Sequence, residues 1–129
     1  MEGERNRYIA FEIICSHEIT FKALTSALWN GLYTLFGENG TSKTGLWVVA
    51  LNRGILEEGT DPVGEKSTIQ QYRGILRMNH RSTEIIRTVL AFISEIDGIP
   101  ALIHVLGISG TIKAARNKYL SPSTSVSQK

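Results

Sequence analysis

The first part of the chain changes from an alternating to a helical pattern of apolar residues. Residues 7–15 are rich in β-branched and aromatic side chains and end at a Ser-His-Glu turn, which predicts a strand. In residues 20–36 the apolar positions recur at intervals of three and four, which predicts a helix ending at Gly37. One face of this strand carries Ile9, Phe11, Ile13 and Cys15. One face of this helix carries Phe21, Leu24, Leu28, Leu32 and Leu35.

The middle of the chain alternates between polar stretches and short apolar runs. Residues 37–45 are expected to form a loop, and residues 46–52 a second strand. Residues 53–72 are polar and contain turn signals around Asp61-Pro62, which predicts a long loop before a third strand at residues 73–79. The sequence Arg-Gly-Ile-Leu begins at both Arg53 and Arg73, through duplication or coincidence, so either copy could pair first as the third strand.

Helical periodicity returns in the last part of the chain. Ser82 is expected to cap a second helix that runs to about Ile96. Residues 101–106 predict a fourth strand, and residues 111–120 predict a third helix. Both ends of the chain are polar. A flexible N-terminus over residues 1–6 and a disordered, serine-rich tail over residues 121–129 are therefore expected.

The predicted order of elements is β-α-β-β-α-β, followed by a helix. This is the arrangement of α+β folds of the ferredoxin-like or RRM-like kind, in which an antiparallel sheet carries two helices on one face. A chain of 129 residues is expected to form a single domain, here over residues 7–120. RNA-recognition modules, metabolite-binding domains and enzymes all use this fold, so the fold does not identify a function.

Composition excludes several classes of protein. Hydrophobic residues make up 42% and charged residues 20%, as in ordinary globular proteins. The apolar runs are too short to span a bilayer, and the polar start of the chain does not resemble a secretion signal. The single cysteine, Cys15, permits neither an internal disulfide nor a thiolate zinc site, and its position predicts a place in the core. A cytoplasmic location is therefore expected.

Catalytic and metal-binding motifs fit the sequence poorly. Ser16, His17 and Glu18 are adjacent, so they cannot point at one another as a catalytic relay must. Residues 107–111 lack the closing glycine of a nucleophile elbow, and residues 37–43 lack the glycine that precedes the lysine of a phosphate-binding loop. The three histidines lack the spacing of metal ligands. No catalytic residue, metal site or bound cofactor is expected in this chain.

The charge is divided unevenly along the chain. Residues 1–65 carry five basic and nine acidic side chains, a net charge of −4. Residues 66–129 carry nine basic and three acidic side chains, a net charge of +6. This asymmetry favours a polyanionic partner for one surface, although chance clustering on solvated faces would look the same.

Two basic segments account for most of the positive charge. The first alternates arginines along the predicted third strand and supplies the candidate RNA contacts Arg73, Arg77, His80 and Arg81. The second begins at a turn, Ser109-Gly110-Thr111, where the free N–H groups of a helix N-terminus favour an anion. It continues along the third helix with Lys113, Arg116 and Lys118. An amphipathic helix with an ordinary solvated side is the alternative.

Aromatic residues are sparse where RNA-recognition sheets carry them. Positions that commonly stack bases hold Ile75, Arg77 and His80, and Tyr8 is the only outward aromatic expected on the first strand. Base stacking on the sheet is therefore not expected, and any RNA contact should be mainly with phosphate and sugar. On the first helix, Trp29, Tyr33 and Phe36 form a second apolar stripe. This stripe predicts either a protein interface or a wider core.

Three segments resemble the archaeal ribonuclease P protein component 2 family. They are RYIAFEII at residues 7–14, RGILRMNHRS at 73–82 and GISGTIKAARNKYL at 107–120. The stretch LWNGLYTLFGENG at residues 28–40 also fits. The resemblance covers residues 7–120, and the sequence Ser-Gly-Thr-Ile-Lys-Ala-Ala-Arg is its most specific part. The length of residues 53–72 and the serine-rich tail depart from the family pattern.

The resemblance implies a subunit of a ribonucleoprotein endonuclease that removes the 5′ leader from precursor tRNA. The RNA subunit would carry out the Mg²⁺-dependent hydrolysis, and the protein would bind no cofactor itself. The implied partners are ribonuclease P RNA, precursor tRNA and protein component 3, with a homodimer inside a heterotetramer. Two alternatives remain from the residues alone. One is a generic RNA-binding module associated with the ribosome, and the other is a ferredoxin-like regulatory domain that binds a small molecule.

Overall fold

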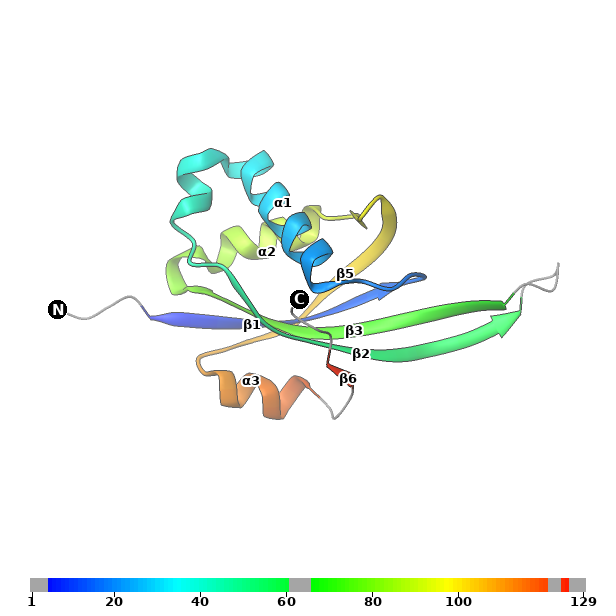
Figure 1. Cartoon of the computed structure of the whole chain (residues 1–129). Helices are drawn as coiled ribbons and strands as arrows, with labels where there is room; N and C mark the ends of the chain where they lie inside the picture. Colours follow the sequence, from blue (N-terminus) through cyan, green and yellow to red (C-terminus); the bar gives the residue numbers. More distant parts are fainter. Residues whose placement is uncertain (1–4, 61–65, 121–123, 126–129) are drawn as a thin grey trace.

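The fold is seen in a computed structural model that describes residues 5–60, 66–120 and 124–125. Its antiparallel sheet is built on four long strands: β1 (Asn6–Cys15), β2 (Trp47–Thr60), β3 (Lys66–Asn79) and β5 (Ile99–Ser109). Two strands of two residues each, β4 (Glu95–Ile96) and β6 (Thr124–Ser125), lie at the edges. The strand order is β4-β5-β1-β3-β2-β6 (Figure 1).

Helices cover both faces of the sheet. Helices α1 (Phe21–Ser42) and α2 (Thr83–Phe92) pack on one face, here called the inner face, and α3 (Ile112–Tyr119) lies on the opposite, outer face (Figure 1). A single 3₁₀ turn, η1 (His80–Ser82), joins β3 to α2. The arrangement confirms the expected α+β fold of the ferredoxin-like kind with an additional C-terminal helix.

The main core lies between the inner face and the first two helices. It is formed by buried aliphatic and aromatic side chains from the sheet, α1 and α2, among them Ile9, Phe11, Leu28, Leu76 and Ile86. Gly31 lets α1 and α2 approach closely, because a Cβ at this position would lie 2.9 Å from Cγ1 of Val89. Cys15 belongs to the same core, as its strand position predicts.

The loop expected at residues 37–45 is partly helical. Gly37 interrupts α1 with φ 72° and ψ −175°, a conformation that glycine adopts easily, and the helix then resumes as far as Ser42. The Thr41 hydroxyl donates a hydrogen bond of 2.7 Å to the Gly37 carbonyl, which stabilises this last turn. The expectation that the helix ends at Gly37 is wrong, because the Thr41 side chain beyond the break supplies a hydrogen bond to the continued helix.

The expectation of a long loop over residues 53–72 is wrong for the residues that the structure describes, 53–60 and 66–72. Residues 53–60 continue β2 and residues 66–72 begin β3, so the two strands form an extended hairpin (Figure 1). The two Arg-Gly-Ile-Leu copies therefore lie on partner strands, and neither is a loop. Pairing satisfies the backbone groups of a polar segment as well as of an apolar one, which composition does not reveal. The expected turn around Asp61-Pro62 lies outside the described residues.

Helix α2 is shorter than its apolar period predicts. Ile93 adopts an extended conformation, and Ile96 belongs to β4, where it pairs with Ile99 of β5. Asp97 and Gly98 connect the two strands with φ values of 58° and 78°, as a tight Asp-Gly hairpin requires. Ser82 precedes α2 as expected but makes no capping hydrogen bond through its side chain. The turn chemistry of Asp97-Gly98 therefore overrides the helical spacing of the isoleucines.

Both expected flexible ends contain described strand residues. Asn6 already belongs to β1 and is paired with Asn79 of β3. Thr124 and Ser125 form β6 and pair with Arg53 and Asn52 of β2. At these positions the expectation of a flexible start and a disordered tail is wrong, because free edges and ends of neighbouring strands offer backbone partners.

Candidate nucleic-acid interface

The register of the sheet brings the two basic segments together. Tyr8 of β1 is paired with Arg77 of β3 on one side and with Ser109 of β5 on the other. Arg77 is in turn paired with Trp47 of β2. Neighbouring strands are about 4.8 Å apart, so Arg77 and the start of the Ser109-Gly110-Thr111 turn are separated by roughly 10 Å. We call the four positions Trp47, Arg77, Tyr8 and Ser109 the outer row.

The outer row faces away from the core. Strand alternation puts Ile9, Leu76 and Val48 on the inner face, where all three are buried, so their neighbours Tyr8 and Arg77 point outward. The Trp47 side chain is 61% exposed. The arginine alternation in the first basic segment therefore has the orientation expected from the sequence, with Gly74, Leu76 and Met78 buried and Arg77 on the outer face.

Helix α3 covers the part of the outer face next to this row. Its Ala115 is fully buried, as are Ala10 and Ile75 of the sheet beneath it. Tyr119 lies over Gly107, where an added Cβ would come within 1.9 Å of the tyrosine hydroxyl oxygen. These contacts hold the second basic segment against the sheet. The glycine is required because the tyrosine occupies the space of its side chain.

Arg73 has structural partners within the protein. Its Nη2 lies 3.4 Å from Oε2 of Glu12, and its Nη1 donates a hydrogen bond of 3.3 Å to the Tyr119 carbonyl. A cation at the last carbonyls of a helix is favourable, so Arg73 stabilises the C-terminal end of α3 on the sheet. Among the expected phosphate contacts, Arg73 is therefore the one already engaged by other groups of the chain.

The remaining candidate cations are more accessible. His80, Arg81, Lys113, Arg116 and Lys118 are exposed, and Arg77 is half-buried. The Lys118 ammonium lies 5.5 Å from the centre of the Tyr119 ring. Among residues 5–41, 43–53 and 69–120, whose side chains the structure describes, none of these six side chains forms an ion pair with a carboxylate. Their charge is therefore available to a polyanion.

The expected anion-binding turn directly follows the outer row. Thr111 caps α3, and its Oγ1 accepts a hydrogen bond of 3.1 Å from the amide of Ala114. The amides of Ile112 and Lys113 have no partner within the helix ladder, as at any helix N-terminus. A Cβ added at Gly110 would meet nothing within 4 Å, so the approach to this turn is open. Backbone donors and the Lys113 side chain thus lie at the β5 end of the row.

Sequence reasoning missed several residues at this end of the sheet. Trp47 is the most prominent, and the unbroken apolar run of residues 46–51 gives no local signal of which side chains point outward. The backbone of Lys43 accepts a hydrogen bond of 2.6 Å from the Asn79 side chain, and the Arg5 carbonyl accepts one of 2.8 Å from the amide of His80. These contacts bring two more basic residues to the end of β3, which no local pattern predicts.

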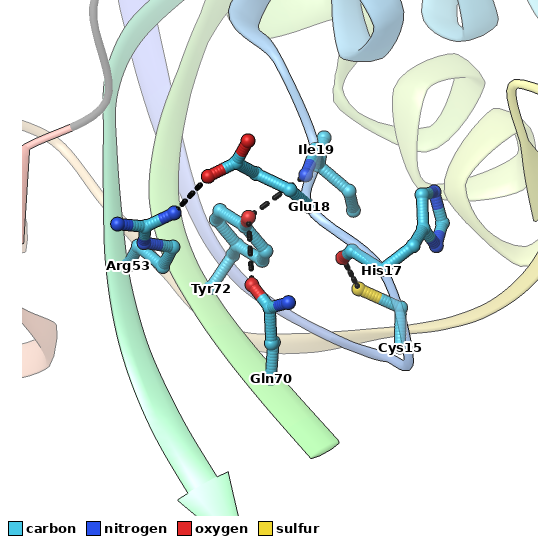
Figure 2. A network of polar contacts seen from close by, with 7 residues as sticks. All are labelled: Cys15, His17, Glu18, Ile19, Arg53, Gln70 and Tyr72. Carbon is cyan, nitrogen blue, oxygen red and sulfur yellow. Dashed lines mark hydrogen bonds and ion pairs between the residues drawn. The ribbon is translucent and has the colours of Figure 1, made fainter. Parts of the chain in front are cut away.

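A separate polar network holds the connection between β1 and α1 (Figure 2). The Tyr72 hydroxyl accepts a hydrogen bond of 2.8 Å from the Ile19 amide and donates one of 3.2 Å to Gln70, while Arg53 pairs with Glu18. Glu18 thus faces an arginine of β2 rather than His17, as Figure 2 shows, and the adjacent Ser16, His17 and Glu18 form no relay. The network is structural.

Burial controls the acid–base chemistry of this network. Burial raises the pKa of the Tyr72 phenol, so the hydroxyl remains a hydrogen-bond donor across the neutral range. Burial also raises the pKa of the Cys15 thiol, which donates a hydrogen bond of 3.1 Å to the His17 carbonyl. A thiol in this state is a poor nucleophile, so Cys15 acts as a core residue.

The aromatic stripe belongs to α1, which packs on the inner face of the sheet, opposite α3. Trp29, Tyr33 and Phe36 are 38%, 61% and 37% exposed, so the stripe remains outside the core. A groove of about 780 Å³ lies nearby, between α1 and residues 92–98, and small polar side chains such as Thr20, Ser26 and Asn30 form much of its lining. The surface of α1 is therefore separate from the basic outer face.

The described parts of the chain contain neither a cluster of metal-binding side chains nor a membrane-spanning helix. Within them, no three side chains of the histidine, cysteine, aspartate and glutamate types come together as a metal site would require. No described helix is both long and apolar enough to cross a bilayer.

Comparison with known proteins identifies the family. Residues 7–120 match the model of the Rpp14/Pop5 family. Ribonuclease P protein component 2 of Methanothermobacter thermautotrophicus is 32% identical over 117 residues, which cover 91% of this chain and 86% of that protein. The proteins of the same name from Pyrococcus furiosus and Methanobrevibacter smithii are 31% and 33% identical, over 92% and 88% of this chain and 85% and 87% of their own lengths. This chain therefore belongs to the Rpp14/Pop5 family.

Proposed function

We propose that this chain is a protein subunit of ribonuclease P and supports removal of the 5′ leader from precursor tRNA. The observation that carries the proposal is the convergence of the two basic segments on one face, in a chain whose relatives are named ribonuclease P protein components. Arg77 and the Ser109-Gly110-Thr111 turn flank Tyr8, and no described carboxylate neutralises the cations around them.

The mechanism assigned to the protein is electrostatic. Arginine and lysine side chains neutralise closely spaced phosphates and release counterions, which lets a folded RNA bring negatively charged strands together. We assign this role to the exposed or half-buried side chains of Arg77, His80, Arg81, Lys113, Arg116 and Lys118. Arg73 acts indirectly by holding α3. Hydrolysis itself is assigned to the RNA subunit, which uses Mg²⁺.

The aromatic stripe of α1 is assigned to a protein partner, protein component 3. Aromatic side chains supply much of the binding energy at protein interfaces, and Tyr33 presents most of its surface to solvent. Helix α1, which carries the stripe, lies on the side of the sheet opposite α3 (Figure 1). The subunit would therefore bind RNA on the outer face and protein on the α1 side at the same time. Two copies of the chain would form a homodimer within a heterotetramer. A cytoplasmic location fits this role.

Reconstituted cleavage of precursor tRNA tests the proposal. The reaction contains the catalytic RNA and protein component 3, with and without this chain, at limiting Mg²⁺. We expect faster 5′-leader removal when the chain is present, and a smaller gain with Tyr33→Ala because partner binding is weakened. Leu102→Ala, an equally exposed position on β5, is the matched control. Equal cleavage in the presence and absence of the chain would refute the proposal.

A further inference from the structure

The outer row combines aromatic and cationic side chains in a way that the electrostatic role does not require. Trp47, Arg77 and Tyr8 occupy directly paired positions on three adjacent strands. The Cβ atoms of such pairs lie about 4.5–5.5 Å apart, so the three side chains form one continuous surface. Trp47 is among the most exposed large apolar side chains of the described residues, at 61%.

We propose that the outer row is a stacking platform for unpaired RNA bases. This departs from the expectation that bases do not stack on the sheet, because the register adds the exposed Trp47 ring to Tyr8. The inference rests on the proposed function, and it adds that this part of the RNA is single-stranded. Every base has a π-face that can stack on an aromatic ring, and arginine adds a cation–π contribution. Trp47 and Tyr8 would each take one base, with the Arg77 guanidinium between them.

The surroundings of the row favour a nucleic acid over a protein. The Ser109-Gly110-Thr111 turn and Lys113 lie at one end of the row, where they can bind the phosphates that join the stacked bases. The outer face of β1 carries Tyr8, Ala10 and Glu12 in turn. The Glu12 carboxylate is already paired with Arg73 and Gln71. The row therefore offers apolar ring surface flanked by unneutralised positive charge, which complements a base with its phosphate.

The geometry also favours single strands over duplex RNA. Bases in a duplex are stacked inside the helix and expose only their edges, so aromatic rings have no base face to contact. The outer row spans four strands, or about 14 Å. This length suits two or three unpaired nucleotides. In addition, α3 projects from the outer face and restricts the approach of a wide duplex (Figure 1).

Binding of the full-length chain to short RNA probes tests the platform. The probes are a single-stranded octauridylate and a blunt duplex of eight base pairs, each measured by fluorescence anisotropy at one salt concentration. We expect Trp47→Ala to weaken binding of the single strand about tenfold, because one base loses its stacking partner. Trp47→Phe should restore most of the affinity. Phe92→Ala, which removes a 51% exposed aromatic side chain from α2, is the matched control.

Tryptophan fluorescence provides a direct signature of stacking. The chain contains two tryptophans, so in Trp29→Phe the indole emission comes from Trp47 alone. We expect the single strand to quench this emission, because a stacked base contacts the indole whereas a phosphate does not. Unchanged affinity in Trp47→Ala, absence of quenching, or binding of neither probe would overturn the platform. If the Trp47→Ala variant stimulates precursor-tRNA cleavage as strongly as the wild-type chain does, the platform is overturned but the proposed function still stands.

Discussion

At the residue scale, a few side chains with several partners hold distant segments of the chain together. Tyr72 is fully buried and its hydroxyl serves two groups, the Ile19 amide and the Gln70 side chain (Figure 2). Arg73 similarly joins Glu12 to the last carbonyl of α3. Each forms hydrogen bonds between segments that are distant in sequence. Removing either side chain should therefore affect the placement of a whole element.

Replacement of Tyr72 by phenylalanine tests this view. Tyr72→Phe removes the acceptor of the buried Ile19 amide, so we expect the free energy of unfolding to fall by about 1–3 kcal/mol. Denaturant unfolding monitored by circular dichroism measures the change. Tyr33→Phe removes the hydroxyl of an exposed tyrosine and should have no measurable effect. Equal stability of Tyr72→Phe and the wild type would show that the hydrogen bond is dispensable.

The same residue makes stability depend on alkaline pH. Burial raises the pKa of Tyr72, so the folded state keeps the phenol protonated to a higher pH than the unfolded state does. Its contribution is therefore complete below about pH 10, where the unfolded phenol is neutral, and is lost as the pH rises through the folded-state pKa. Tyr72→Phe should show a weaker decline in stability over this alkaline range.

At the element scale, α3 depends on one close approach to the sheet. The Tyr119 ring fills the space that a side chain at position 107 would need, since a Cβ on Gly107 would lie 1.9 Å from the Tyr119 hydroxyl oxygen and 2.4 Å from Cζ. A helix of eight residues is too short to be stable by itself. Its position, and with it that of Lys113 and Arg116, must come from packing.

Substitution of Gly107 should displace α3. We expect Gly107→Ala to lower the free energy of unfolding by about 1–3 kcal/mol, because the tyrosine ring must move or the sheet must deform. In a Tyr119→Ala background, the same substitution should cost less, which a double-mutant cycle of denaturant unfolding measures. Gly110→Ala, in open space at the start of α3, is the matched control. Additive effects of Gly107→Ala and Tyr119→Ala would contradict the packing argument.

At the scale of the whole molecule, the two faces of the sheet have different chemistry. The inner face is covered by α1 and α2 and supports the core, whereas α3 lies on the outer face (Figure 1). The outer face also carries the outer row. The acidic first half of the sequence and its basic second half are interleaved in the sheet, because β1 lies between β3 and β5. Strand order therefore brings Arg77 of β3 and the basic segment that follows β5 to either side of β1, which the distribution of charge along the sequence does not show.

The salt dependence of RNA binding tests this surface. Lys113→Ala combined with Arg116→Ala should weaken binding and reduce the slope of log K against log salt by about one for each lost phosphate contact. Filter binding to the ribonuclease P RNA at several salt concentrations gives the slope. Lys22→Ala removes an exposed cation from α1, on the opposite side of the sheet, and should leave the slope unchanged. A slope unaffected by the double substitution would remove Lys113 and Arg116 from the interface.

Much of this protein was determined locally and could be predicted from its sequence. The alternation in β1, the spacing in α1 and the Thr111 cap with the basic side of α3 are properties of contiguous residues, so they predicted the fold class and the candidate cations. The candidate interface was less complete: Trp47, Lys43 and Arg5 were missed, and Arg73 was not expected to hold α3.

Tertiary structure decided what depends on pairing between distant segments. The extended β2–β3 hairpin, the end of α2 at β4 and the placement of β6 arise because backbone groups found partners on other strands, which polarity and period do not encode. Strand register likewise set Trp47, Arg77, Tyr8 and Ser109 side by side. The sequence by itself identified the candidate RNA-binding residues, and the sheet decided which of them lie side by side, because register is a property of two strands and never of one.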